Sequence, residues 1–291
     1  MIMEKTPPRR FAIATHPSQL QVFEGAQDLA ERLFTLGAES VAVHTIYESA
    51  LSRAVSNAEI DVLIALGGDG TMLRAGHLVA PMGIPVLGIN RGRFGFLMEI
   101  DEVDCLARME QLLRGEYRLE NRMMLHVVHL RGDEVLGEWN VLNEVVVCRG
   151  QYVRPIQVKA SLDGYLLASY VADGVIAATA TGSTAYALAV GGPIMPPELR
   201  NILIVPVAPH LSFDRSTILS EGARVTLAVN TNHEAVLSAD GQSPVFLKDG
   251  DAVDVFASEY TINFVRFQDH GYFYRNLRKY MEQNPIAGIS L

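Results

Sequence analysis

Short apolar runs alternate with helix-like segments through the first third of the chain. The runs are aliphatic and bounded by turn residues, which is typical of buried strands. They predict strands at 11–15, 41–46, 61–66 and 85–90. Between them, apolar residues recur at helical spacing. One predicted helix would follow an N-cap at Ser18 and share a face of Val22, Ala26, Leu29, Leu33 and Leu36.

A further helix is predicted over about 102–113, with Val103, Leu106, Met109 and Leu113 on one face. Strands alternating with helices indicate a parallel, doubly wound (Rossmann-like) α/β sheet. In such sheets ligands bind at the carboxyl ends of the strands. We therefore expect any site in this region at that edge.

From about residue 119 the pattern changes to many short strands separated by turn signals such as Asp-Gly. This spacing favours an all-β, sandwich-like domain. The expected strands are 123–130, 141–148, 156–162, 201–207, 224–230, 235–239 and 251–257. A helix over 271–280 is expected to pack back on the first domain. The predicted domains are 1–118, joined by 258–291, and 119–257.

Composition narrows the classes of function. The 291 residues carry a net charge of −9 and scattered basic residues, which does not favour nucleic-acid binding. Cys105 and Cys148 lack the spacing of a disulfide framework or a zinc site, so a reducing cytoplasm is expected. The N-terminal residues lack the apolar core of a signal peptide. No apolar run is long and continuous enough to span a membrane.

The segment Leu66-Gly67-Gly68-Asp69-Gly70-Thr71 ends an apolar run and opens a helical pattern. A glycine turn at a helix N-terminus points backbone N–H groups and the positive end of the helix dipole at a ligand, which favours an anion. Asp69 offers either a base or a metal ligand there. The alternative is a tight connection without chemistry.

Four other segments contain glycine, hydroxyl or charged residues that the packing of a hydrophobic core does not require. They are the glycine-rich stretch 88–97, the polar pair Asn143-Glu144 inside an aliphatic run, the hydroxyl-rich block 173–186 and the turn Asp240-Gly241-Gln242. A buried amide and carboxylate must find partners, in the protein or in a ligand such as an adenine edge and a ribose. The block 179–186 suits a sugar, a pyrophosphate and a base ring, or its residues Gly182-Ser183-Thr184 cap the helix after it. Asp-Gly at 240 is ordinarily hairpin chemistry.

Together these segments resemble the NAD kinase family over roughly residues 60–275. GGDGT alone is shared with lipid kinases; the GIN-x-G-x-x-GFL loop and the TGSTAY block followed by GGP are specific to NAD kinase. The resemblance implies an α/β domain plus a β-rich domain, homodimers or homotetramers, and an enzyme acting on NAD and ATP or another donor. It also implies a divalent metal, Mg²⁺, brought with the donor phosphates rather than held by a side-chain cluster.

Carried over position by position, the resemblance implies that Asp69 accepts the proton of the 2′-hydroxyl of the adenosine ribose. Arg74 would lie near phosphate, and Arg154 falls where relatives often carry a histidine contact. Val171 occupies a position that is arginine in some relatives. The remaining implied nucleotide-binding residues are Gly68, Gly70, Thr71, Asn143, Glu144, Asp173, Thr184, Ala185, Tyr186, Ala187, Leu188, Ala189 and Gln242.

The chemistry agrees with these residues. A ribose hydroxyl is a poor nucleophile, and a positioned carboxylate that takes its proton contributes roughly 10²–10⁴-fold to the rate. Phosphoryl transfer then needs alignment and charge neutralisation. The alternatives are a lipid or sugar kinase of the GGDGT class and a non-catalytic dinucleotide-binding sensor. A lipid kinase would need a contiguous apolar groove, and a sensor would not need Asp69.

Overall fold

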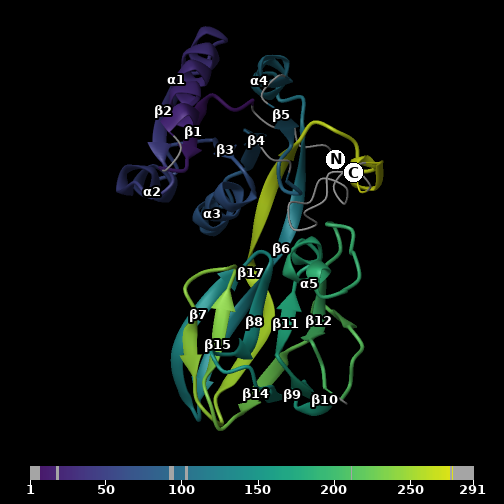
Figure 1. Cartoon of the computed structure of the whole chain (residues 1–291). Coiled ribbons are helices and arrows are strands. Elements are labelled where there is room, and N and C mark those ends of the chain that lie inside the picture. The colour runs from purple at the N-terminus through teal and green to yellow at the C-terminus, as the bar shows by residue number, and fades with distance from the viewer. Residues whose placement is uncertain are drawn as a thin grey trace. The chain divides into compact units, whose positions relative to one another are not determined.

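The computed structural model describes residues 7–17, 20–91, 95–101, 104–210, 212–275 and 277. The chain divides into two compact units, one formed by 1–121 with 262–291 and the other by 122–261. Two long strands, β6 (Arg118–Arg131) and β17 (Ala252–Arg266), contribute residues to both units (Figure 1).

The first unit is built on a parallel sheet in the order β4-β3-β1-β2. Its strands are β1 (Arg10–Thr15), β2 (Ser40–Thr45), β3 (Val62–Gly67) and β4 (Val86–Asn90). The end of β17 pairs in parallel with β4 through Phe264 and Val86, and the short β5 (Ile100–Asp101) also pairs with β4. The parallel sheet predicted from the alternating pattern is therefore present.

Helices cover both faces of this sheet (Figure 1). They are α1 (Leu20–Thr35), α2 (Ser49–Ser56), α3 (Asp69–Val79), the 3-10 turn η1 (Ala80–Met82) and α4 (Cys105–Leu113). Helices α1 and α4 bury Leu29, Leu33, Met109 and Leu112 against alternate strand residues such as Ile64. On the opposite face, Met72 of α3 packs on Gly88.

One predicted core position of these helices is wrong, and two predicted residues lie outside the part of the chain that the structure describes. Leu106 is 44% exposed rather than packed in the core, because Leu112 occupies the inward position with Met109 and Leu113. Ser18 and Val103, predicted as an N-cap and a core position, lie outside the described residues.

The second unit is an antiparallel sandwich. One sheet contains β10-β9-β14-β17 and the β6–β7 hairpin, and the other has the order β13-β12-β11-β8-β15-β16. Apolar residues that alternate along strands of both sheets form one core. The strands are β7 (Glu134–Val141), β8 (Glu144–Arg149), β9 (Ile156–Leu162), β10 (Tyr165–Ala172), β11 (Gly174–Ala178), β12 (Asn201–Val207), β13 (Thr217–Ser220), β14 (Val225–Asn230), β15 (Ala235–Ala239) and β16 (Val245–Leu247).

The predicted strand 141–148 is wrong as a single element. Strand β7 ends at Val141 and β8 begins at Glu144, so Leu142 and Asn143 form a break. Strands β5, β7, β10, β11, β13 and β16 were not predicted, apart from Val141 at the end of β7. Of the predicted helix 271–280, the described part is helical at 272–275 and 277. Tyr272 there is buried, with its ring facing the Arg118 guanidinium.

Among the described residues, no helix combines the length and the apolar character that a membrane crossing requires. Between β11 and β12, the 3-10 turn η3 (Gly182–Thr184) and the short helix α5 (Tyr186–Ala189) interrupt the β structure. These two elements contain the end of the hydroxyl-rich block, residues 182–186.

Candidate functional site

Asp69 is the first residue of α3, directly after β3 and the Gly67-Gly68 turn. The turn is compact because the N–H groups of Thr71 and Met72 donate to the Gly68 carbonyl at 3.0 and 3.1 Å. A side chain at Gly67 would overlap the Thr71 hydroxyl. The glycine turn thus sets a carboxylate at the start of an 11-residue helix, the end whose free N–H groups attract anions.

The carboxylate of Asp69 is held by the backbone at the end of the glycine-rich stretch 88–97. The N–H groups of Phe96 and Leu97 donate to its Oδ2 and Oδ1 at 3.0 and 3.1 Å. A Cβ at Gly95 would overlap the same carboxylate. Residues 92–94 of the stretch lie outside the described residues. The structure therefore joins two of the segments selected from the sequence, through contacts that local patterns do not encode.

Burial raises the pKa of Asp69 above its usual value, while the Leu97 and Phe96 N–H groups and the charge of Arg266 oppose this rise. A raised pKa makes a carboxylate a stronger base, provided that it stays ionised at the working pH. Asp69 is thus both oriented and more basic than an exposed aspartate.

Arg266, at the end of β17, lies behind this loop and is fully buried. Its guanidinium donates to Glu99 at 3.0 Å, to Glu120 at 3.1 Å and to the Leu97 carbonyl at 3.3 Å. Because the Leu97 N–H binds Asp69, the buried ion pairs fix the loop that orients the carboxylate. No sequence motif identified Arg266, since its partners are 146 to 169 residues away.

The other residues predicted near the glycine turn do not bind the Asp69 carboxylate. Gly70 is exposed and Thr71 is buried. Arg74 is exposed, and its guanidinium lies over the Tyr47 ring, 5.0 Å from the centroid. Tyr47 follows β2, so Arg74 belongs to the same edge of the sheet, but it forms no hydrogen bond or ion pair with Asp69 among the described residues.

In the second unit, Asp240 organises the break between β7 and β8. Its carboxylate accepts the N–H groups of Leu142, Asn143 and Glu144 at 2.6, 2.8 and 3.0 Å. Asp240 and Gly241 both have positive φ, as the predicted hairpin turn between β15 and β16 requires. The turn residue therefore does more than reverse the chain, because it fixes the polar pair selected from the sequence.

Glu144 is 8% exposed, and its Oε2 has no hydrogen-bond partner among the described residues. Burial, helped by the nearby charge of Asp240 and opposed by the Tyr186 N–H, raises its pKa to about 8. At neutral pH this carboxyl is therefore largely protonated, and it can both donate and accept a hydrogen bond. A buried polar atom without a partner is a natural contact for a ligand.

The hydroxyls of the block 179–184 are mostly used within the protein. Thr179 Oγ1 donates to the Leu142 carbonyl at 2.5 Å, Ser183 Oγ donates to the Ala180 carbonyl at 2.7 Å, and Thr184 Oγ1 donates to the Thr181 carbonyl at 3.1 Å. A Cβ at Gly182 would overlap the Asn143 carbonyl, so the block packs directly on the polar pair. The hydroxyls thus build the turn.

The capping alternative for this block is wrong. The N-cap position of α5 is Ala185, without a side-chain hydrogen bond. Tyr186 itself is 43% exposed. Burial, followed by the nearby Cys148 and Asp173, raises the pKa of its hydroxyl. Asp173 in turn forms an ion pair with Arg149, Nε to Oδ1 at 3.1 Å.

One cluster of the second unit therefore contains Glu144, Asp240, Tyr186 and Asp173. Arg149 and Cys148 also belong to it and were not selected from the sequence, because neither forms part of a recognisable motif. The α5 residues Ala187, Leu188 and Ala189 adjoin the cluster through Tyr186, with Ala187 buried. The predicted residues Arg154 and Gln242 are both exposed.

In the described part of the chain, no three His, Cys, Asp or Glu side chains are grouped so as to hold a metal ion.

Two family models match, the ATP-NAD kinase N-terminal domain over residues 12–117 and the ATP-NAD kinase C-terminal domain over 142–267. The chain is 39% identical over 274 residues to an NAD kinase of Symbiobacterium thermophilum, covering 91% of this chain and 96% of that one. It is 34% identical over 277 residues to an NAD kinase of Dehalococcoides mccartyi, covering 95% and 97%.

Solved structures show the same fold. A yeast NADH kinase complexed with NADH superposes with a TM-score of 0.77 at 23% identity, covering 96% of this chain and 89% of that one. An NAD kinase from Archaeoglobus fulgidus in complex with ATP gives a TM-score of 0.69 at 25% identity, covering 93% and 98%.

Proposed function

The chain belongs to the NAD kinase family, and we propose that it transfers the terminal phosphoryl group of ATP, or of another donor, to the 2′-hydroxyl of the adenosine ribose of NAD, giving NADP. The observation that carries the proposal is the Asp69 carboxylate, set at the start of α3 and held by the N–H groups of Phe96 and Leu97.

Asp69 acts as the general base in this proposal. Its two backbone donors fix the carboxylate, so it can take a proton from a hydroxyl without losing orientation as the reaction proceeds. Burial strengthens it as a base. The free N–H groups of the first turn of α3 bind phosphate oxygens and stabilise the charge that develops on the transferring group.

The cluster around Glu144 binds the dinucleotide. Its protonated carboxyl has an unused Oε2, which suits a hydroxyl of a ribose or a nitrogen of a base. Tyr186 offers an exposed ring that can stack on a heterocycle, and the ion pair of Arg149 and Asp173 offers polar groups to a second ribose. The proposed contacts of Asn143, Thr184 and Gln242 rest on the family resemblance.

The divalent cation implied by the family fits this chain as a partner of the donor. Mg²⁺ in phosphotransferases is bound by substrate phosphates, water and one or two carboxylates. Bound in this way, it would neutralise charge on the donor phosphates.

We also propose a homo-oligomer, a cytoplasmic location and the domain division 1–118 with 258–291 and 119–257. Support for the oligomer comes from β10, the last strand of its sheet, where Tyr165 and Leu166 are 82% and 66% exposed. Large apolar side chains on an edge strand are typical of a surface that pairs with another chain. Sedimentation of the purified protein measures its oligomeric state.

A ligand-binding experiment separates this function from that of a lipid kinase. NAD and NADP should each raise the melting temperature, because a ligand that binds only the native state stabilises it. Diacylglycerol and sphingosine analogues should leave the melting temperature unchanged. Stabilisation by a lipid analogue without stabilisation by NAD would contradict the proposed acceptor.

A further inference from the structure

Arg149, the last residue of β8, joins two residues that were predicted to bind the dinucleotide. Its Nε lies 3.1 Å from Oδ1 of Asp173. Its Nη1 donates to the Tyr152 carbonyl at 3.2 Å, and the N–H of Arg154 donates to the same carbonyl at 2.8 Å. One guanidinium therefore links Asp173 to the loop that carries Arg154.

The backbone on the Asp173 side of this link is already fixed. The N–H of Arg149 donates to the Asp173 carbonyl at 2.9 Å, where β8 and β11 run antiparallel. A Cβ at Gly174 would overlap the Val147 carbonyl, so the two strands approach each other closely. The Asp173 side chain is partly exposed, and its orientation depends on what its carboxylate binds. Arg149 supplies that partner.

The loop on the other side, residues 150–154, is exposed and is held by polar contacts. Its start is anchored by Glu234, whose carbonyl accepts the Gly150 N–H at 2.8 Å and whose Oε1 accepts the Gln151 N–H at 3.3 Å. Tyr152 and Val153 are both exposed, so core packing does not fix the rest of the loop. The bond from Arg149 to the Tyr152 carbonyl therefore helps to set the part that leads to Arg154.

Charge accounts for the contact between Arg149 and Asp173. The Arg149 Nε–H has no aligned hydrogen-bond acceptor among the described residues, although Asp173 Oδ1 is 3.1 Å away. The contact is thus an ion pair rather than a directed hydrogen bond. Without the guanidinium, Asp173 would add an uncompensated negative charge to a site proposed to receive the pyrophosphate of a dinucleotide, and like charges at short range repel.

We propose that Arg149 is a positioning residue for the acceptor dinucleotide. It acts through two other residues, because it orients the Asp173 carboxylate and holds the loop that presents Arg154. Contacts that are ordered before the ligand arrives reduce the entropy lost on binding, which strengthens binding. The proposal rests on the proposed function, since Asp173 and Arg154 are taken as contacts of NAD.

Steady-state kinetics of the full-length protein test this role. Arg149→Gln keeps a polar planar end but removes the charge, and it should raise KM for NAD about tenfold with kcat and KM for ATP within about twofold of wild type. Arg149→Lys keeps the charge and should restore KM for NAD to within about threefold of wild type. An unchanged KM for NAD in Arg149→Gln, or no recovery in Arg149→Lys, would overturn the proposal.

The matched control is Arg200→Gln. Arg200 lies in the same unit and pairs with Glu221, and both side chains are 40% exposed. Its replacement removes an arginine–carboxylate pair away from the cluster and should change neither KM. An equal rise of KM for NAD in this variant would mean that loss of any such ion pair produces the effect, and the proposal would fail.

A double-mutant cycle shows whether Arg149 acts through Asp173. In the Asp173→Asn background, Arg149→Gln should raise KM for NAD by less than about threefold, because only the link to the loop remains. A full tenfold rise on top of that of Asp173→Asn would show that the two residues act independently, contrary to the proposal.

A further measurement separates positioning from a structural role without using activity. Burial raises the pKa of the Cys148 thiol, and the charge of Arg149 opposes this rise. Since the thiolate is the reactive form, Arg149→Gln should slow alkylation of Cys148 at neutral pH, followed by peptide mass spectrometry. Loosening of the structure would expose the thiol and speed its alkylation.

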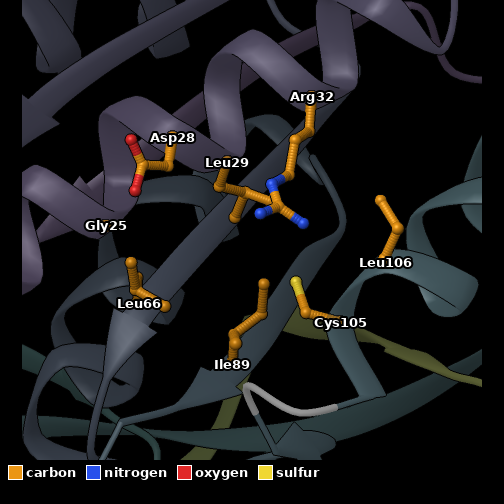
Figure 2. Close-up of a pocket in the computed structure, with 8 residues that line it drawn as sticks. All are labelled: Gly25, Asp28, Leu29, Arg32, Leu66, Ile89, Cys105 and Leu106. Atoms are coloured by element: carbon orange, nitrogen blue, oxygen red, sulfur yellow. The ribbon is translucent and has the colours of Figure 1, made fainter.

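Cys105 is the internal reference for this measurement. It lines a cavity of the first unit, and Figure 2 shows its sulfur pointing toward the Ile89 side chain. Its alkylation rate should be the same in both proteins. Faster alkylation of Cys148 in Arg149→Gln would make Arg149 a structural residue. A wild-type protein that forms no NADP would contradict the proposed function, whereas normal wild-type activity with an unchanged KM for NAD in Arg149→Gln would contradict this inference alone.

Discussion

Glu144→Gln should make the protein more stable at alkaline pH. The carboxyl is buried, and its pKa rises from the ordinary value of 4.5 to about 8. Below pH 4.5 both the folded and the unfolded protein hold this proton, so the group costs nothing. As the pH rises from 4.5 to about 8, the unfolded chain releases the proton while the folded protein keeps it. The free energy of unfolding therefore falls over this window and levels off above it.

The size of the effect follows from the difference between the pKa values of Glu144 in the unfolded and folded protein. At about 1.4 kcal/mol for each tenfold change in the protonation equilibrium, the full cost is about 5 kcal/mol. Relaxation around the charged group and entry of water reduce it, and we expect about 2–5 kcal/mol at pH 9. Glutamine keeps the shape and the hydrogen-bonding edge but does not ionise, so the variant avoids this cost.

The assay is urea denaturation of both proteins at several pH values from 4.5 to 9. The free energy of unfolding of Glu144→Gln minus that of the wild type should grow steadily with pH. Glu259→Gln, which alters an exposed carboxylate of β17, is the control and should show a small difference without this trend. A flat difference for Glu144→Gln would mean that Glu144 ionises normally, and its role as a protonated ligand contact would be refuted.

Three further predictions concern the base, the polar pair and the buried arginine. Asp69→Asn should lower turnover by about 10²-fold or more with NAD affinity retained, as stopped assays and calorimetry can show. Asn143→Ala should weaken NAD binding by about 1–3 kcal/mol in calorimetry of a folded protein; unchanged affinity would make the side chain structural. Arg266→Met should cost about 3–5 kcal/mol of stability in denaturant unfolding, because Glu99 and Glu120 would stay buried without a counter-charge. A loss below about 1 kcal/mol would show that water reaches them.

The sequence predicted those features that one segment encodes. Val62–Gly67, the glycine turn and the helix from Asp69 are contiguous, so periodicity and turn residues place the carboxylate at a helix start. The break at Asn143 was not predicted, because it depends on the Asp240 carboxylate, which lies 97 residues away. An aliphatic run on both sides of a polar pair favours one continuous strand unless that distant acceptor is known.

Arg149 and Arg266 were missed for the same reason, because their partners are known only once the chain has folded. Arg149 and Arg266 sit in strands and belong to no local motif, and their roles arise from ion pairs formed on folding. The hydroxyls of Thr179 and Ser183 were expected to serve a ligand or a cap, but they bind backbone carbonyls within the turn. A short polar side chain near its own backbone competes for such bonds, and only the folded geometry shows which acceptor it takes.

The most direct test of the account is the position of the transferred phosphate. Purified protein, NAD, Mg²⁺ and ATP would be incubated, and the product analysed by phosphorus NMR and by a dehydrogenase that accepts only NADP. The account predicts phosphate on the 2′-oxygen of the adenosine ribose, formed by the wild-type protein and about 10²-fold more slowly by Asp69→Asn. Phosphate at another position, or equal rates for the two proteins, would contradict it.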